Sequence, residues 1–256
     1  MSDTTISDAA LGGAFPQIAP VGLGGLLVRF SDQLSEAANR AALAFRAEVA
    51  LQGFAGVEEL STSLTGTFLR IDPLYPDVAG LCAQLQRLLD SRDWYAAPLP
   101  QGRRHLRIPC VIGGSHGPQW GDAVAASGLA ADQALASLTQ STVRVLTIGF
   151  APGQPYMGQL PPEWNIPRLS QLTPQVPEGA LVIAIRQLII FSASTPTGWR
   201  HIGQSAFRLF RPGADRPFAL NPGDEVSIRA VSAEEYENIR AQDRTGDGGA
   251  QIEVLA

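Results

Sequence analysis

Lysine is absent from this 256-residue sequence, so all 19 of its basic side chains other than histidine are arginines. A Walker A loop needs its lysine on the nucleotide phosphates, and Schiff-base enzymes need a lysine amine, so the sequence excludes both classes. Any carboxylate or phosphate that this protein binds must therefore be held by arginine side chains and backbone amides.

Cysteine and histidine are also scarce. Cys82 and Cys110 form no Cys-x-x-Cys motif, and a buried reduced thiol is a better expectation for each than a nucleophile or a disulfide. His105, His116 and His201 do not follow metal-ligand spacing, either with one another or with a cysteine, so no metal site is predicted. The Gly-x-Ser-x-Gly and His-Glu-x-x-His motifs of common hydrolases are missing as well.

Long apolar runs and excess positive charge are missing too. No segment approaches the roughly 18–20 apolar residues of a membrane span. The first residues lack the basic and apolar regions of a secretory signal, so we expect a cytoplasmic protein without membrane contacts. The net charge of −5 offers no basic surface for nucleic acid. A hydrophobic fraction of 45% with 17% charged residues is typical of a globular chain.

The first part of the chain mixes strand-like and helix-like segments. Residues 1–19 are polar and proline-punctuated, which predicts a flexible lead-in. Residues 20–95 then contain a strand near 24–30, a helix with apolar residues at helical spacing over 31–52, two strands, and a second helix near 77–91. This order predicts a small α/β sandwich domain.

The second part of the chain has a different pattern. Residues 96–105 are rich in proline, glycine and arginine and are expected to form a linker. Residues 106–240 contain many short β segments separated by turns and few helices, which indicates a compact β-barrel. Residues 241–256 are predicted to be a mobile tail. The predicted fold class is therefore α+β.

One loop has an unusual composition for a surface segment. Residues 149–168 combine many prolines and glycines with Phe150, Tyr156 and Trp164, and end on Arg168. Such a segment can be neither a helix nor a central strand, and a loop this rigid and bulky is expected to be packed and functional. We interpret it as one wall of a cleft in the barrel or as a seam with a partner subunit.

A second segment repeats this composition. Residues 195–205 contain a turn glycine, a tryptophan and basic side chains, and Gln187 lies in a strand between the two segments. Pro152 and Gly153 would let the backbone approach a ligand closely. Arginine and glutamine beside an aromatic cleft suit a carboxylate or an amide. The alternative is that the aromatic residues and prolines close the ends of the barrel while the arginines are solvated.

The chain resembles the allophanate hydrolase subunit 1 family, on the evidence of the segments IGFAPGQPYMGQLPPEWNIPR, TPQVPEGALVIAIRQLIIFSASTPTGWRHIGQS and IPCVIGGSHGP. The resemblance extends in order over residues 20 to 235. This family also contains KipI-type kinase inhibitors and the B-type subunit (PxpB) of the bacterial ATP-dependent 5-oxoprolinase. The resemblance implies that the barrel is cyclophilin-like and follows a small α/β domain.

The resemblance also implies partners and an activity. Members pair with a homologue of allophanate hydrolase subunit 2, which is the C-type subunit of 5-oxoprolinase. With a LamB/YcsF-type protein as the A-type subunit, the pair opens 5-oxoproline to glutamate at the cost of ATP. We therefore expect a subunit that is inactive alone and binds no cofactor alone, with ATP used by the complex. A KipI-like inhibitor of a histidine kinase and a carboxyltransferase-type subunit in urea or allophanate metabolism are the alternatives.

Matching the family blocks residue by residue selects a candidate binding site but no catalytic residue. In this hypothesis Arg168 holds a carboxylate, Gln187 holds an amide, and Tyr156 and Trp199 form flat walls. The remaining matched positions are Pro152, Gly153, Gly158, Pro167, Pro177, Gly179, Pro196, Gly198 and Gly203, of which Pro152, Gly153 and Gly198 are expected at the site.

Five positions depart from the usual family pattern. Leu138 replaces a histidine, Gln154 an aromatic residue, Thr197 a glycine, Gln204 an arginine and Gln119 an acidic residue. The departures at 138, 204 and 119 remove titratable groups that a catalytic cleft could use, whereas ligand binding can survive them.

Overall fold

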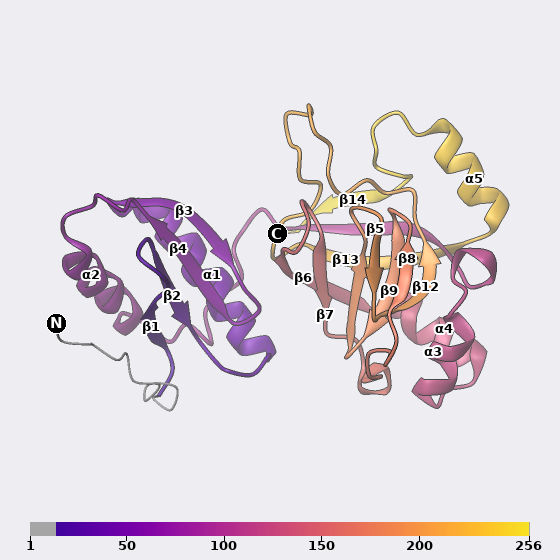
Figure 1. Cartoon of the computed structure of the whole chain (residues 1–256), viewed down its shortest axis with the longest axis horizontal. Helices are drawn as coiled ribbons and strands as arrows, with labels where there is room; N and C mark the ends of the chain where they lie inside the picture. The colour runs from indigo at the N-terminus through magenta and orange to yellow at the C-terminus, as the bar shows by residue number, and fades with distance from the viewer. Residues whose placement is uncertain (1–13, 256) are drawn as a thin grey trace. The chain divides into compact units, whose positions relative to one another are not determined.

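The computed structural model describes residues 14–255 and divides the chain into two compact units, Met1–Pro100 and Gln101–Ala256 (Figure 1). The division falls inside the segment expected to be a linker, 96–105. The predicted fold class, a small α/β unit followed by a β-barrel, is confirmed.

The first unit is a four-stranded antiparallel sheet combined with two helices. The strand order is β1-β2-β4-β3. The elements are β1 Gln17–Pro20, β2 Gly25–Arg29, α1 Glu36–Gln52, β3 Val57–Thr62, β4 Gly66–Ile71 and α2 Val78–Asp90. Residues 1–13 of the expected lead-in lie outside the described residues, and its last part is not loose, because β1 pairs with β2.

Local sequence explains where α1 begins and ends. The Ser35 hydroxyl accepts a hydrogen bond from the backbone N–H of Ala38, and Gly53 ends the helix in the left-handed conformation with φ of 64°. Helix α1 buries Phe45, which packs edge-to-face against Phe30 and Trp94 at centroid distances of 5.7 and 5.1 Å. The two helices and the sheet thus share one apolar core.

The second unit is a closed seven-stranded barrel. Its strand order is β12-β9-β10-β7-β6-β13-β5, and β12 pairs with β5 to close it. The strands are β5 Arg104–Ile112, β6 Thr142–Ile148, β7 Pro155–Gly158, β9 Ala180–Ala184, β10 Gln187–Ile190, β12 Arg200–Gln204 and β13 Glu225–Val231. A separate ribbon pairs β8 Thr173–Val176 with β11 Thr195–Thr197.

Few helices accompany the barrel. They are α3 Trp120–Ser127, α4 Ala131–Gln140 and α5 Ala233–Gln242, with 3₁₀ turns at Gly114–His116 (η1) and Pro162–Trp164 (η2). Over residues 14–255, the chain forms no helix that combines the length and apolarity required to cross a membrane.

The expected mobile tail is partly a strand. Gln251–Val254 form β14, which pairs antiparallel with the first half of β5 (Figure 1). The preceding turn is fixed by Asp243, whose carboxylate accepts hydrogen bonds from the backbone N–H groups of Thr245, Gly246 and Gly248. A glycine- and aspartate-rich segment therefore forms an ordered turn here because a side chain satisfies its backbone donors.

Strands β9 and β10 separate two apolar clusters. Alternate residues such as Leu181 and Leu188 face the main barrel core, whereas Val182 and Ile189 face a second cluster that includes Trp199. Trp164, interpreted from sequence as a cleft wall, is fully buried in the main core instead. Its indole N–H donates to the Ser137 hydroxyl at 3.0 Å, so its polar atom is satisfied inside.

Both cysteines are free. Cys110 is buried in the barrel core, and burial raises the pKa of its thiol to about 12, so it is protonated and inert at neutral pH. Cys82 is half-buried rather than fully buried.

Candidate functional site

The barrel unit carries a groove over the second apolar cluster, which we call the aromatic groove. Its volume is about 310 Å³. The structure brings four of the candidate residues, Tyr156 from β7, Arg168, Gly198 and Trp199, to its lining, and two segments distant in sequence supply them. The remaining lining residues are Phe150, Gln154, Leu169, Leu172, Ile189, Phe191, Pro196 and Thr197.

Trp199 organises the aromatic groove. Its ring lies edge-to-face with Tyr156 at a centroid distance of 6.3 Å. The guanidinium carbon of Arg168 lies 5.3 Å from the centroid of the same ring, within cation–π range. Trp199 is only 5% exposed and belongs to the apolar cluster beneath, so the surface on which Arg168 rests is rigid.

Arg168 is positioned to bind an anion. It is exposed, and no ion pair joins it to a carboxylate among residues 14–255. Stacking on an aromatic face leaves the N–H groups at the edge of a guanidinium free, and these form the fork that matches a carboxylate. The aromatic groove can therefore hold a small flat molecule with a carboxylate at one end.

Three of the predicted site residues do not line this groove. Gln187 is buried in β10, where it pairs in register with Gly158 and Ala184. Pro152 and Gly153 lie in the turn before β7, and a Cβ atom at Gly153 would lie 2.8 Å from the Leu209 carbonyl oxygen. Close packing against another loop therefore explains why residue 153 is a glycine, and no bound ligand is needed to explain it.

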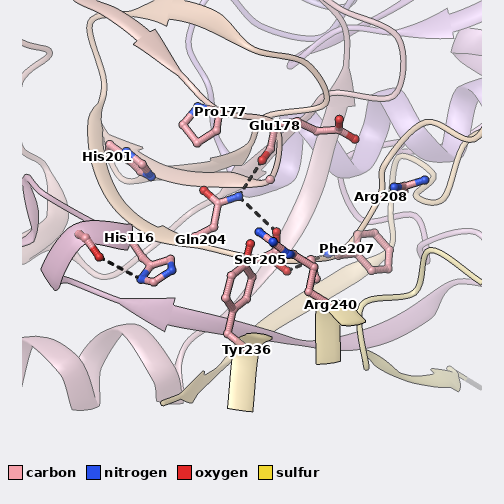
Figure 2. A pocket seen from close by; sticks show the side chains of 13 residues that line it. His116, Pro177, Glu178, His201, Gln204, Ser205, Phe207, Arg208, Tyr236 and Arg240 are labelled. Atoms are coloured by element: carbon pink, nitrogen blue, oxygen red, sulfur yellow. Dashed lines mark hydrogen bonds between the residues drawn. The ribbon is translucent and has the colours of Figure 1, made fainter. Parts of the chain in front are cut away.

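A second cavity, which we call the polar pocket, lies elsewhere on this unit (Figure 2). Its volume is about 370 Å³. Residues from η1, the turn before β9, the end of β12 with the loop that follows, and α5 all contribute to it. Its lining residues with polar side chains are Ser115, His116, Glu178, His201, Gln204, Ser205, Arg208, Tyr236 and Arg240.

Hydrogen bonds and ring contacts fix much of the polar pocket. His201 donates from Nε2 to the Gly203 carbonyl at 3.0 Å, and burial lowers the pKa of its imidazole, so the ring is neutral at neutral pH. His116 packs edge-to-face on Tyr236 at a centroid distance of 5.2 Å. The Gln204 amide donates to the Glu178 carbonyl at 2.6 Å. The pocket is therefore a built, polar surface rather than a gap between loops.

Sequence reasoning missed this pocket because barrel closure assembles it. His116 and His201 are far apart in the chain, and judging histidines by linear spacing cannot reveal that both line one cavity. A signal was present at Gly179, whose φ is +79° and whose Cβ would lie 2.2 Å from the Ser205 carbonyl oxygen. A glycine required by so close an approach marks where two loops meet.

The five family departures occupy different environments. Leu138 is fully buried in the barrel core, Gln154 and Thr197 line the aromatic groove, and Gln204 lines the polar pocket. The Gln119 side chain accepts from the backbone N–H of His201 at 2.7 Å and donates to the Thr173 hydroxyl at 3.1 Å. Gln119 thus has a structural role, holding β12 and β8 together.

No group of three or more His, Cys, Asp or Glu side chains in residues 14–255 is arranged to hold a metal ion. Binding at either cavity must be explained by arginines, neutral hydrogen-bond donors and aromatic surfaces.

Comparison with known proteins identifies the family. Residues 16–220 match the family described as carboxyltransferase domain, subdomain C and D. The B-type subunit of 5-oxoprolinase from Bacillus subtilis (strain 168) is 29% identical over 228 residues, which cover 86% of this chain and 95% of that protein. The protein of the same name from Escherichia coli O157:H7 is 37% identical over 123 residues, or 48% of this chain and 56% of that one.

Solved structures agree with this assignment. The structure of TTHA0988 has a TM-score of 0.68 and 27% identity, covering 82% of this chain and 40% of the longer TTHA0988 chain. The match to the urea amidolyase of K. lactis has a TM-score of 0.70 and covers 93% of this chain and 16% of the amidolyase chain. Because the two sequences are only 14% identical, this match shows the fold alone. This chain therefore belongs to the carboxyltransferase-domain family of subdomains C and D and is a relative of the proteins named as the B-type subunit of 5-oxoprolinase.

Proposed function

We propose that this chain is the B-type subunit of a heteromeric, ATP-dependent hydrolase that opens 5-oxoproline to glutamate. The observation that carries the proposal is the match to the Bacillus subtilis protein of that name, which extends over 95% of the relative's length. We infer that it acts in the cytoplasm with a homologue of the C-type subunit and with a LamB/YcsF-type protein as the A-type subunit.

The aromatic groove suits the proposed substrate. 5-Oxoproline is a small, nearly flat ring with one carboxylate, and a groove of about 310 Å³ is at the small end of the range for ligand sites. Arg168 would bind the carboxylate while Trp199 and Tyr156 contact the faces of the ring. The predicted role of Gln187 would need this buried side chain to be exposed by partner binding.

The composition of the groove supports a heteromeric enzyme. The described lining residues of the groove include no histidine, aspartate, glutamate or cysteine, which are the side chains that most often transfer protons or attack a substrate. A subunit whose partner provides the catalytic groups needs only to bind the substrate and does not need to transfer a proton. We therefore propose that the groove becomes an active site only in the complex.

Affinity isolation of the tagged chain from its own host, followed by mass spectrometry, tests the proposal. We expect a homologue of the C-type subunit and a LamB/YcsF-type protein to co-elute. The family description favours carboxyl transfer as a second candidate, and co-elution of a biotin carboxylase would support that function instead. A histidine kinase recovered without either set of subunits would contradict both enzymatic functions.

A further inference from the structure

Two arginines join the polar pocket to a neighbouring hollow. Arg208 and Arg240 line the polar pocket, and both also line a hollow of about 390 Å³ to which Arg211 and Arg244 contribute. Arg208 comes from the loop after β12, Arg240 from α5, and Arg244 from the turn after α5. Four arginines therefore surround a continuous polar surface in a chain whose net charge is −5.

We propose that this surface binds a phosphate-bearing anion, with Arg208 and Arg240 as its principal ligands and Arg244 beside them. The proposed site is separate from the aromatic groove, since the two share no lining residue. It goes beyond the proposed function, because nothing in that function assigns a ligand to this surface.

Nearby carboxylates leave much of this positive charge uncompensated. The Asp243 carboxylate accepts hydrogen bonds from the backbone N–H groups of its own turn, and Asp247 forms an ion pair with Arg211 at 2.8 Å. Glu178 is the acidic residue among the described lining of the polar pocket, which holds two arginines. Arg208 and Arg244 form no ion pair or side-chain hydrogen bond with any other residue in 14–255.

Arg240 has one charged neighbour. Glu237 lies 3.3 Å away on the same helix, with both side chains more than half exposed at 63% and 51%. Exposed pairs of this kind contribute little stability, so a bound anion can compete for the guanidinium.

Neutral donors complete the polar pocket. Figure 2 shows the Tyr236 hydroxyl directed toward Gln204 and Ser205, with the His116 ring beside it. Hydroxyl and imidazole N–H groups can donate to phosphate oxygens that the arginines leave free. Charged donors and neutral donors therefore line the same pocket.

The backbone that carries Arg208 is held in place before any ligand binds. The Arg208 N–H donates to the Gly246 carbonyl at 2.8 Å, and the Arg211 guanidinium donates to the carbonyls of Arg208 and Gly246 at 3.0 and 2.9 Å. A Cβ atom at Gly248 would lie 2.4 Å from Phe207 N, so the two loops are in direct contact. Such preorganisation lowers the entropy cost of binding.

The number and placement of the arginines favour phosphate over a simple carboxylate. A single guanidinium fork satisfies one carboxylate, whereas a phosphate monoester carries a charge of about −1.5 to −2 and three acceptor oxygens. Guanidinium groups from separate elements can approach such an ion from several sides.

Isothermal titration calorimetry on the full chain tests this inference directly, with tripolyphosphate, inorganic phosphate, ATP and succinate as separate probes. We expect tripolyphosphate to bind, and the double variant Arg208→Gln, Arg240→Gln to bind it at least about tenfold more weakly. Arg87→Gln removes one positive charge from an exposed position on α2, outside the proposed site, and should leave the affinity unchanged. Circular dichroism checks that each variant is folded.

The probes separate the sources of phosphate. Equal affinities for ATP and tripolyphosphate mean that the phosphate chain alone is recognised, and tighter ATP binding means that the nucleoside is contacted as well; both support the site. Succinate binding as tightly as tripolyphosphate, no phosphate binding at millimolar concentration, or an unaffected double variant would overturn it. The experiment needs neither partner subunits nor 5-oxoproline, so its failure leaves the proposed function untouched.

Discussion

Replacing Arg168 with alanine is expected to lower the kcat/KM of the assembled complex for 5-oxoproline by roughly tenfold to a hundredfold. A hydrogen bond to a charged group contributes about 1.5–3 kcal/mol, and this variant removes the proposed carboxylate partner entirely. Because the carboxylate is bound before and during the reaction, the loss should appear chiefly in KM. Steady-state kinetics of a reconstituted complex measures it.

Two further variants make this prediction specific. Arg168→Lys keeps a point charge but loses the planar fork and the stacking on Trp199, so it should recover only part of the affinity. Arg87→Ala, in the other unit, should behave like wild type. The fold of Arg168→Ala should be intact because Arg168 is exposed. Unchanged kinetics for Arg168→Ala would refute the assignment of the carboxylate site.

Trp164→Ala should destabilise the barrel unit by about 3–5 kcal/mol, the usual cost of removing a large buried aromatic side chain. Trp164 is fully buried, stacks on Trp120 at a centroid distance of 6.0 Å, and donates to Ser137. Equilibrium denaturation of the full chain measures the effect. The barrel transition should move to lower denaturant while that of the first unit stays in place.

Phe150→Ala is the matched control, since this aromatic residue from the same loop is 77% exposed and should change stability by less than about 0.5 kcal/mol. A Trp164→Ala effect as small as the control would show that Trp164 is not part of the core. Together the two variants distinguish the core residue Trp164 from the exposed residue Phe150 of the same loop.

The sequence predicted the fold well because the two units differ in periodicity. Helical spacing recurs through α1 and α2, whereas short β segments and turns dominate after residue 105. The aromatic groove was partly predictable for a related reason. Strands β7, β10, β9 and β12 are neighbours in the barrel, so two loop segments at their ends meet over one cluster.

The direction of individual side chains was not predictable. Composition could not show that the 3₁₀ turn η2 directs Trp164 inward, or that Gln187 is buried, because both depend on the packing of the closed barrel. The polar pocket depends on still longer-range contacts, with α5 and η1 contributing from opposite ends of the barrel sequence. The ordered turn after α5 depends on the hydrogen bonds that the Asp243 carboxylate accepts from backbone N–H groups.

The most direct test of the proposed function is the rate of glutamate formation from 5-oxoproline in a mixture of the purified A-type and C-type subunits, measured with and without this chain. We predict ATP-dependent formation of glutamate only when the chain is present. Glutamate formation at the same rate without the chain, or none with all subunits and ATP present, would contradict the proposal that it is the B-type subunit of this enzyme.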